Sequence, residues 1–573
     1  MQDAAAPVRG QAPVTDAPAP ATGRRATARG WIRRSWTLLR ETGPSRVQFW
    51  FIALVIGIAS GYAAVGFMLG IELLQTTLYG TDDPHRLHSF AAGLPWWWVL
   101  ILPCLGGLVV GIILTRFTPD ARVRGVAEVI EASAVKEGRV ERRAGLASIA
   151  ASLITLSSGG SSGREGPVVH MCGMIAGWVS NRLNADGITG RDLLGCAVAA
   201  GVAASFNAPL AGALFAMEVV LRHFAVHALA PITIAAASGS VISRIHFGDV
   251  TEFALPTAGE LAFYAELPAF ILLGLTSGLI AFALMRSIIW TEDLASAMQD
   301  RLRIPALFRP AAAGLLLGAL AIFFPHIIGV GYETTSRALS GQLIFHEAVV
   351  FAVLKVAAVS ITMGGRMGGG VFSPALMVGA LSGLAFGLVA TAIFPDISGS
   401  ETLYALAGMG AVAAGVLGAP ISTTLIVFEL TGDWQTGLAV MVAVSISSAL
   451  SSKLVDRSFF LTQLERRGIH LAAGPQRYLL ATIKVSGVMK SPDHPKAPSE
   501  DRIRRAVGDA LFVAPGDTLE KAMPLFEKSG ADFLAVMRLS DGDTPNVLGV
   551  LLHVDALRVF NRALAATAAE EHS

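Results

Sequence analysis

The sequence is poor in charge and in cysteine. Only 15% of its 573 residues are charged, whereas 53% are hydrophobic, and the mean hydropathy is +0.58. This composition excludes an ordinary soluble globular protein, in which about a quarter of the residues are charged. The three cysteines, Cys104, Cys172 and Cys196, all lie in apolar stretches. They form neither a disulfide framework nor the spacing of a metal site, and no metal or cofactor is predicted.

Enzyme motifs and a strong bulk charge are also missing. A glycine-rich run at Ser157–Gly163 could be taken for a phosphate loop, but no Gly-Lys-Ser/Thr follows it. The chain has no nucleophile-elbow pattern and no zinc-binding helix pattern. The net charge of +1 gives no sign of a nucleic-acid partner. We therefore expect neither an enzyme nor a nucleic-acid-binding protein.

Long apolar runs, by contrast, are abundant. They are Phe49–Leu74, Trp96–Leu114, Leu193–Val220, Leu261–Ile289, Ala311–Phe324, Val349–Ile361, Leu376–Phe394 and Leu403–Leu430. Several are about 20 residues or longer, which is enough for a helix to cross a bilayer. The 60 glycines and 27 prolines imply that many of these helices are interrupted, which a membrane protein tolerates where protein or a wet cavity shields the backbone. The sequence predicts an all-α polytopic membrane protein.

Composition divides the chain into segments. Residues 1–46 read as a disordered basic tail, residues 47–468 as the membrane domain, residues 469–484 as a linker, residues 485–567 as a small α/β domain and residues 568–573 as a tail. Arginines close to the first span predict a cytoplasmic N-terminus. No apolar core with a cleavage site precedes that span, so we expect no signal peptide. We expect a multi-pass protein of the cell (inner) membrane with both termini in the cytoplasm.

The membrane domain contains an internal repeat, with copies at about residues 47–250 and 260–468. The segment Ala208–Glu218 recurs as Ala419–Glu429, and in each copy Ala-Pro opens an apolar helix with a Glu nine residues after the Pro. A glycine-rich break precedes each copy, at Gly159–Pro167 and at Gly364–Pro374. Broken helices at matching places of two repeats point to a transport site near the membrane midplane. The repeat alone does not decide between parallel and inverted copies.

The segment Gly163–Pro167 (Gly-Arg-Glu-Gly-Pro) places a carboxylate inside this apolar chain. Pro167 suits a first helical turn, so Glu165 is predicted to lie at a helix N-terminus, where free N–H groups and the helix dipole attract anions. An acidic side chain at membrane depth is a functional-site hypothesis by default. The alternative is a helix cap that stays in place.

Two further segments complete a constellation: Gly369–Pro374 (Gly-Gly-Val-Phe-Ser-Pro) and Phe206–Gly212 (Phe-Asn-Ala-Pro-Leu-Ala-Gly). With Gly163–Pro167, in this order, they resemble the CLC family of chloride channels and chloride/proton antiporters, bacterial type. The resemblance covers about residues 47–468. It implies an inverted repeat of broken transmembrane helices, chloride or a similar small anion as the transported ion, and a homodimer with one pore in each subunit.

The resemblance also assigns roles to residues. In the family, the Glu of the first motif is a movable gate that leaves an anion site when it is protonated, and this role falls on Glu165. The predicted anion-binding residues are Gly163, Arg164, Glu165, Gly166, Gly370, Val371, Phe372 and Phe460. For Arg164 a structural salt bridge is an equal alternative, and for Val371 and Phe372 the alternative is plain helix packing.

The chain departs from the family pattern at three places. The inner proton-carrying Glu of the antiporters, one residue beyond Glu218, is here Val219. The family's Gly-Ser-Gly-Ile-Pro segment corresponds to Val123–Ala127, which has neither the Ser nor the Pro, and Arg124 faces either the pore or the cytosol. The family's late pore-closing Tyr corresponds to Phe460. Both hydroxyls that would bind a central anion are therefore missing.

These departures favour passive, channel-like conduction. A chloride/proton antiporter with a non-standard proton route is the alternative within the family. A cation transporter carrying a regulatory domain is the alternative of another class, although its single acidic residues would make poor cation ligands.

The C-terminal segment resembles a CBS (cystathionine-β-synthase) domain through Pro515–Ala522, Val547–Val550 and Asp555. Helices are predicted at Thr518–Ser529 and His553–Leu564, and strands at Phe533–Leu539 and Val547–Leu552. Nucleotide binding is not favoured, because Leu552 replaces the Thr or Ser found three residues before the Asp in binders.

Overall fold

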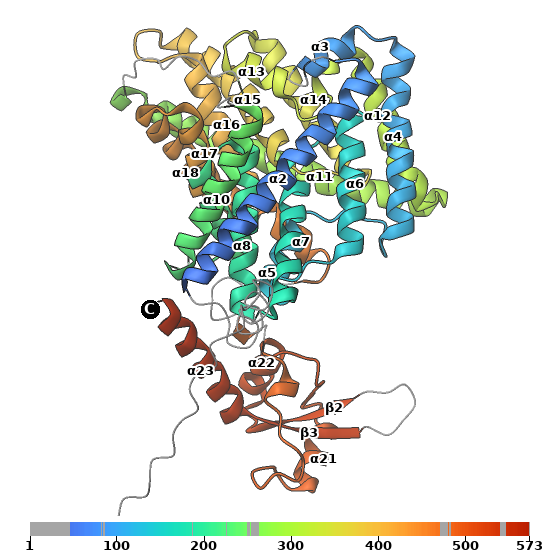
Figure 1. The fold of residues 1–573 in the computed structure, drawn as a ribbon, viewed down its shortest axis with the longest axis vertical. Coiled ribbons are helices and arrows are strands. Elements are labelled where there is room, and N and C mark those ends of the chain that lie inside the picture. Colours follow the sequence, from blue (N-terminus) through green and yellow to red (C-terminus); the bar gives the residue numbers. More distant parts are fainter. Residues whose placement is uncertain are drawn as a thin grey trace, which may run out of the picture. The chain divides into compact units, whose positions relative to one another are not determined.

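The computed structural model describes residues 46–571, apart from 82, 84–85, 186, 225, 249–252, 254–262, 456, 470, 472–478, 481–482 and 539–545. The predicted basic tail, except its last residue, and most of the predicted linker lie outside the described residues. Within them the chain is mainly helical, with one small sheet near its end (Figure 1).

The first repeat begins with two helices separated by a short one and continues through shorter, interrupted helices. Its elements are α2 (Arg46–Tyr79), α3 (Leu87–Ala92), α4 (Trp96–Phe117), α5 (Val126–Val135), α6 (Arg142–Ser157), α7 (Glu165–Leu183), α8 (Gly187–Phe206), α9 (Pro209–Phe215), the π-helical turn η2 (Ala216–Leu221) and α10 (Val226–Phe247).

The second repeat has the same plan of long spans followed by broken helices. Its elements are α11 (Phe263–Leu302), η3 (Ala306–Phe308), α12 (Arg309–Phe323), η4 (Pro325–Ile327), α13 (Tyr332–Leu339), α14 (Phe345–Gly364), α15 (Phe372–Ile393), α16 (Glu401–Leu417), α17 (Pro420–Thr431), α18 (Trp434–Leu454) and α19 (Phe459–Glu465).

Among the described residues, nine helices are long and apolar enough to cross a membrane. Each predicted apolar run falls on one or more helices, which confirms the polytopic all-α prediction. Two runs are split as their prolines require: Leu193–Val220 into α8, α9 and η2, and Leu403–Leu430 into α16 and α17. The apolar runs named from the sequence did not include α6, α10 and α18, although α10 and α18 are long and apolar enough to cross a membrane.

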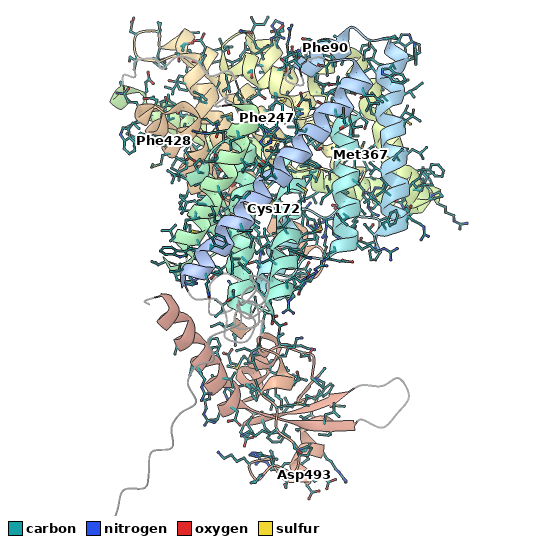
Figure 2. The ribbon with its side chains drawn as sticks, viewed as in Figure 1. Phe90, Cys172, Phe247, Met367, Phe428 and Asp493 are labelled. Carbon is teal, nitrogen blue, oxygen red and sulfur yellow. The ribbon has the colours of Figure 1, made fainter. Side chains whose placement is uncertain are left out.

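Small residues let the central helices pack closely. In α8 every residue from Leu193 to Phe206 is buried, and in α16 every residue from Leu403 to Leu417. Both stretches are rich in Ala and Gly, which allow helix backbones to approach each other within a membrane. Side chains fill the space between the helices, and Cys172 of α7, labelled in Figure 2, is fully buried.

The two repeats are inverted with respect to each other. Glu429 at the end of α17 accepts hydrogen bonds from the N–H groups of Leu210 and Ala211 at the start of α9, at 2.9 and 2.7 Å. Glu218, just after α9, accepts bonds from Ile421 and Ser422 at the start of α17, at 3.0 and 2.8 Å. Equivalent helices therefore run antiparallel, which requires a twofold axis in the membrane plane.

The C-terminal unit is a small α/β domain. Its elements are η5 (Val485–Gly487), α21 (Glu500–Gly508), β1 (Phe512–Val513), α22 (Leu519–Ser529), β2 (Phe533–Arg538), β3 (Asn546–Leu552) and α23 (His553–Glu571). In the sheet, β2 lies between β1, which is parallel to it, and β3, which is antiparallel. The two strands and two helices predicted from the sequence are confirmed, and α23 runs past the predicted domain end at residue 567 to Glu571.

Asp555 in the first turn of α23 is held by two cations. Lys490 Nζ lies 2.6 Å from its carboxylate, and Arg558 donates a bond of 2.7 Å. The hydrogen bond from Lys490 is the main cause that lowers the pKa of Asp555, and the nearby charges of Lys490 and Arg558 add to it. The carboxylate of this motif residue is thus engaged within its own domain.

Candidate functional site

The two glycine-rich breaks, about 200 residues apart in the chain, meet in space. Gly163 and Gly370 form an isolated antiparallel bridge in which each N–H donates to the other's carbonyl, both at 2.7 Å. Backbone contact this close requires glycine: a Cβ on Gly370 would lie 3.0 Å from the Gly166 nitrogen, and one on Gly369, at φ +125°, 2.0 Å from the Ser162 hydroxyl. The junction holds the starts of α7 and α15 side by side.

Glu165 is the first residue of α7, as its motif predicts, and its side chain turns toward α15. The Ser373 hydroxyl donates to one carboxylate oxygen, and the Ser373 N–H donates to the other at 3.4 Å. The residue is only 4% exposed. Its carboxylate therefore lies at the N-terminus of the 22-residue α15, in the position where a helix end favours an anion.

Arg164, the residue before Glu165, contacts two other helices. Its guanidinium donates to the Ser205 carbonyl at 2.9 Å and lies 5.2 Å from the centroid of the Tyr332 ring. The side chain is 8% exposed. Arg164 thus supplies fixed positive charge beside the junction while fastening α7 to α8 and α13.

The junction leaves some N–H donors free and uses others. Gly163 and Gly370 donate to each other, so their N–H groups are engaged in the bridge. No acceptor among the described residues is found for the N–H groups of Gly166, Val371 and Phe372, as expected where a helix begins. These three residues, and Phe460 as the second residue of α19, therefore have main-chain donors available to an anion.

A cavity of about 90 Å³ opens at this junction. Gly166, Gly370, Val371 and Phe460 contribute to its wall, so four of the predicted anion-site residues share one space. Phe372 does not line the cavity; its ring packs 4.8 Å from the ring of Phe206. Both predictions for Phe372 therefore describe it: its ring packs against another helix, and its main-chain N–H lies at a helix start.

The segment matched to the family's serine loop also reaches this cavity. Val123–Val126 lines it, and α5 begins there. Glu128 folds back to accept a bond from the Gly125 N–H at 2.6 Å. Arg124 lines the cavity, with its guanidinium donating two bonds of 3.1 Å to Asp120. A paired arginine and a helix start thus occupy the place of the missing serine.

Val219 lies in the π-helical turn η2 and is 5% exposed. Its neighbour Glu218 is committed to capping α17, where it also accepts a bond from the Ser422 hydroxyl. Glu218 thus bonds to the backbone of the other repeat, which is a structural role.

The sequence reading missed Ser373. Its hydroxyl and N–H are the donors that hold Glu165, although it lies inside the motif Gly369–Pro374. The available signal was a hydroxyl at the second position of a helix whose start was already predicted to face an anion.

Residues 106–452 match the sequence profile of the family described as voltage gated chloride channel. The chain belongs to this family.

Curated relatives agree with this assignment. The chain is 34% identical over 396 residues to a putative chloride channel protein ClcB-like of Ralstonia nicotianae, an alignment that covers 68% of this chain and 91% of that relative. It is 26% identical to the chloride channel protein CLC-f of Arabidopsis thaliana, over 91% of this chain and 71% of that protein.

Solved structures share the fold. A slow cyanobacterial Cl⁻/H⁺ antiporter aligns with a TM-score of 0.66 at 21% identity, covering 74% of this chain and 98% of the other. A CLC-type fluoride/proton antiporter aligns with a TM-score of 0.60 at 22% identity, covering 72% and 96%. Both bear out the inverted-repeat membrane fold. Members of this family are channels and transporters, so the chain is not an enzyme.

Proposed function

We propose that this protein carries chloride, or a similar small anion, across a lipid bilayer through a pore that Glu165 gates. One observation carries the proposal: the Glu165 carboxylate lies against the N–H and hydroxyl donors at the start of α15. A helix start of this kind attracts small anions, so the carboxylate and a permeant anion compete for the same place by like charge. Membership of the chloride channel family supports chloride as the ion.

Protonation operates the gate. A neutral Glu165 no longer competes with an anion for the positive helix end, so it leaves, and the anion takes its place at the Ser373 N–H and hydroxyl. The N–H groups of Gly166 and Val371 at the same junction supply further donors. Partial charges on N–H groups bind an anion weakly enough for release, which conduction requires. Anion passage should therefore increase as the pH falls.

Conduction is passive in this proposal. A proton route to the inner side needs a titratable group at the position of Val219, and valine has none. Glu218, next to it, is fully used as a helix cap. Coupled exchange is the competing outcome: proton uptake against a gradient, driven by chloride in sealed vesicles, would refute the passive reading.

The decisive experiment measures chloride efflux from liposomes across a range of pH for the wild type and for Glu165→Ala. We expect wild-type efflux to rise at acidic pH and the variant to conduct at every pH. Glu401→Ala is a matched control, because Glu401 also begins a membrane-domain helix, α16, but lies outside the junction. Equal pH dependence in wild type and Glu165→Ala would contradict the gating role.

The proposal includes a homodimer in the cell membrane with both termini in the cytoplasm, a regulatory or dimer-forming CBS-like role for residues 485–567, and no bound nucleotide there. Cross-linking of the protein in native membranes tests the homodimer. Protease accessibility of each terminus in inverted and right-side-out vesicles tests the cytoplasmic location of both termini.

A further inference from the structure

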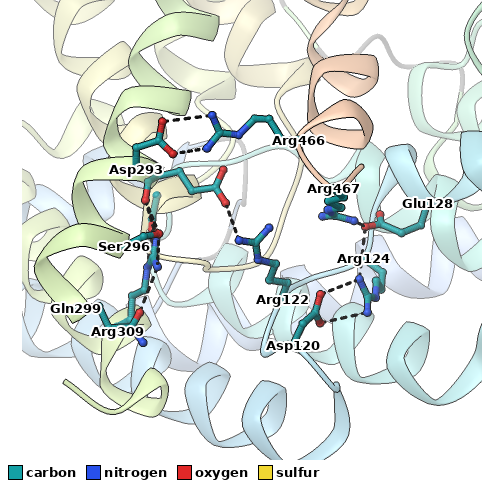
Figure 3. A network of polar contacts seen from close by, with 12 residues as sticks. Asp120, Arg122, Arg124, Glu128, Asp293, Ser296, Gln299, Arg309, Arg466 and Arg467 are labelled. Carbon is teal, nitrogen blue, oxygen red and sulfur yellow. Dashed lines mark hydrogen bonds and ion pairs between the residues drawn. The ribbon is translucent and has the colours of Figure 1, made fainter. Parts of the chain in front are cut away.

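Arg366 differs from the other arginines that line the cavity. Arg122 lies 3.6 Å from Glu292, and Arg467 donates to Glu128 (Figure 3). Arg366 also lines the cavity, yet among the described residues its guanidinium has no hydrogen-bond or ion-pair partner, and its Nε is buried. A buried donor without a partner is costly, so such a group indicates a ligand that the described residues do not supply.

The acids drawn in this network have other cationic partners. Arg124 donates to Asp120, and Arg466 donates to Asp293. Arg309 donates to Ser296, to Gln299 and to the carbonyls of Glu292 and Gly364 (Figure 3). Among the described residues, the other three cavity arginines, Arg122, Arg124 and Arg467, are each paired with an acid, and Arg366 is not.

The backbone fixes Arg366 in place. Its N–H donates to Met363 at 3.0 Å and the N–H of Met367 donates to Thr362 at 3.1 Å, the two bonds of a Schellman motif that ends α14. Arg366 holds the left-handed position of that motif, at φ +58°, which glycine fills at the least cost. Arg222 and Arg303 also adopt positive φ, so this conformation alone assigns no role to Arg366. It fixes the backbone from which the Arg366 side chain extends.

The cavity brings this guanidinium together with main-chain donors. Gly166 and Val371, whose N–H groups have no acceptor among the described residues, share its wall with Arg366 and Phe460. An accessible volume of about 90 Å³ holds a small anion with several water molecules, since one water needs about 10–15 Å³ of such volume.

We propose that Arg366 and these N–H groups form an anion-binding site in the cavity, selective for small planar oxyanions such as nitrate over chloride. This inference rests on the proposed function. A guanidinium presents two parallel N–H donors that match two oxygens of a planar anion, whereas a spherical halide uses that fork less well. In this site Arg366 supplies the directional donors that the missing serine and tyrosine hydroxyls would have given.

The test compares the concentration dependence of nitrate and chloride flux in reconstituted vesicles. Arg366→Gln should raise the half-saturating nitrate concentration about tenfold, the factor expected for one lost charge-assisted hydrogen bond, and chloride by less. Arg366→Lys keeps the charge and loses the fork, so it should restore chloride affinity but not the preference for nitrate.

Two further variants separate binding from general effects. Arg122→Gln removes one positive charge from the same cavity, but that charge is already paired with Glu292, so its effect should be smaller and should fade at high ionic strength. Arg366→Gly relieves the positive φ and should melt at or above the wild-type temperature while losing nitrate preference. A variant that melts at or above the wild-type temperature is folded, so its loss of nitrate preference cannot be due to misfolding.

The outcomes distinguish the two proposals. Equal effects of Arg366→Gln and Arg122→Gln, or an unchanged nitrate-to-chloride ratio in all Arg366 variants, would overturn the oxyanion site while leaving anion transport intact. Absence of any anion flux in the wild type would instead overturn the proposed function itself.

Discussion

Glu218 and Glu429 should stabilise the contact between the two repeats. Each carboxylate caps the first turn of the other repeat's helix. Replacing either glutamate by alanine removes the acceptors that the described residues supply to these main-chain N–H groups at the starts of α9 and α17. The perturbation to test is therefore Glu218→Ala, Glu429→Ala and the double substitution.

The magnitude follows from the bonds that are lost. Glu429 accepts two N–H bonds, and Glu218 accepts two N–H bonds and one from the Ser422 hydroxyl. A hydrogen bond to a charged group contributes about 1.5 to 3 kcal/mol, and we take the lower end of this range because Leu210 and Ile421 are exposed. We expect a loss of about 3 kcal/mol for Glu429→Ala, and about 1 kcal/mol more for Glu218→Ala because of the extra bond.

The assay is thermal unfolding of the purified protein in detergent, followed by tryptophan fluorescence, with anion and proton flux measured on the same samples. Both variants should melt well below the wild type, with Glu218→Ala the lower. The protein that remains folded should show unaltered ion selectivity. The reasoning would be refuted if Glu218→Ala melted like the wild type but changed proton movement, because Glu218 would then be a proton carrier and not a structural residue.

Three further predictions concern single contacts. Ser373→Ala removes the hydroxyl that holds Glu165 at α15. It should raise chloride efflux at neutral pH about tenfold, the factor for a hydrogen bond to the Glu165 carboxylate worth roughly 1.4 kcal/mol. Unchanged efflux would show that the hydroxyl does not hold the gate. Gly369→Ala would bring a Cβ within 2.0 Å of the Ser162 hydroxyl at a φ of +125°, so it should sharply reduce the yield of folded protein, measured by fluorescence-detected size exclusion. Because its cation partners lower the pKa of Asp555, this ion pair should stabilise the C-terminal domain above the unfolded pKa of about 3.9 and be lost as the pH falls through the lower folded value. Hydrogen exchange of β3 and α23 should accordingly be faster in Asp555→Asn than in wild type at pH 7, and equal rates would contradict this.

Much of the membrane fold can be predicted from the amino-acid sequence. Apolar runs locate the spans because a bilayer selects for length and hydropathy. Proline after a glycine- or alanine-rich stretch locates the breaks where it opens a new helix, as at Pro209 and Pro420, because proline suits the first turn. Glu165 could be placed at a helix start from its own motif, since Pro167 two residues later also suits a first turn.

Other features could not be read in this way. Helix α6 has only 16 residues and buries three serines against protein, so its sequence gives no clear apolar run. The partner of Glu165 is 208 residues away, at Ser373, and local patterns say nothing of contacts at that separation. The pairing of the cavity arginines likewise depends on which acids the fold brings within reach.

The amino-acid sequence by itself thus determined which segments enter the membrane and where their helices break. It also placed a single carboxylate, Glu165, at one of those breaks. Each of these features is a local consequence of hydropathy and backbone chemistry. Only the tertiary structure decided that the two breaks join through Gly163 and Gly370, that the repeats are inverted, and that the Arg366 side chain has no partner among the described residues. Those facts depend on distances between segments far apart in sequence, which packing alone establishes.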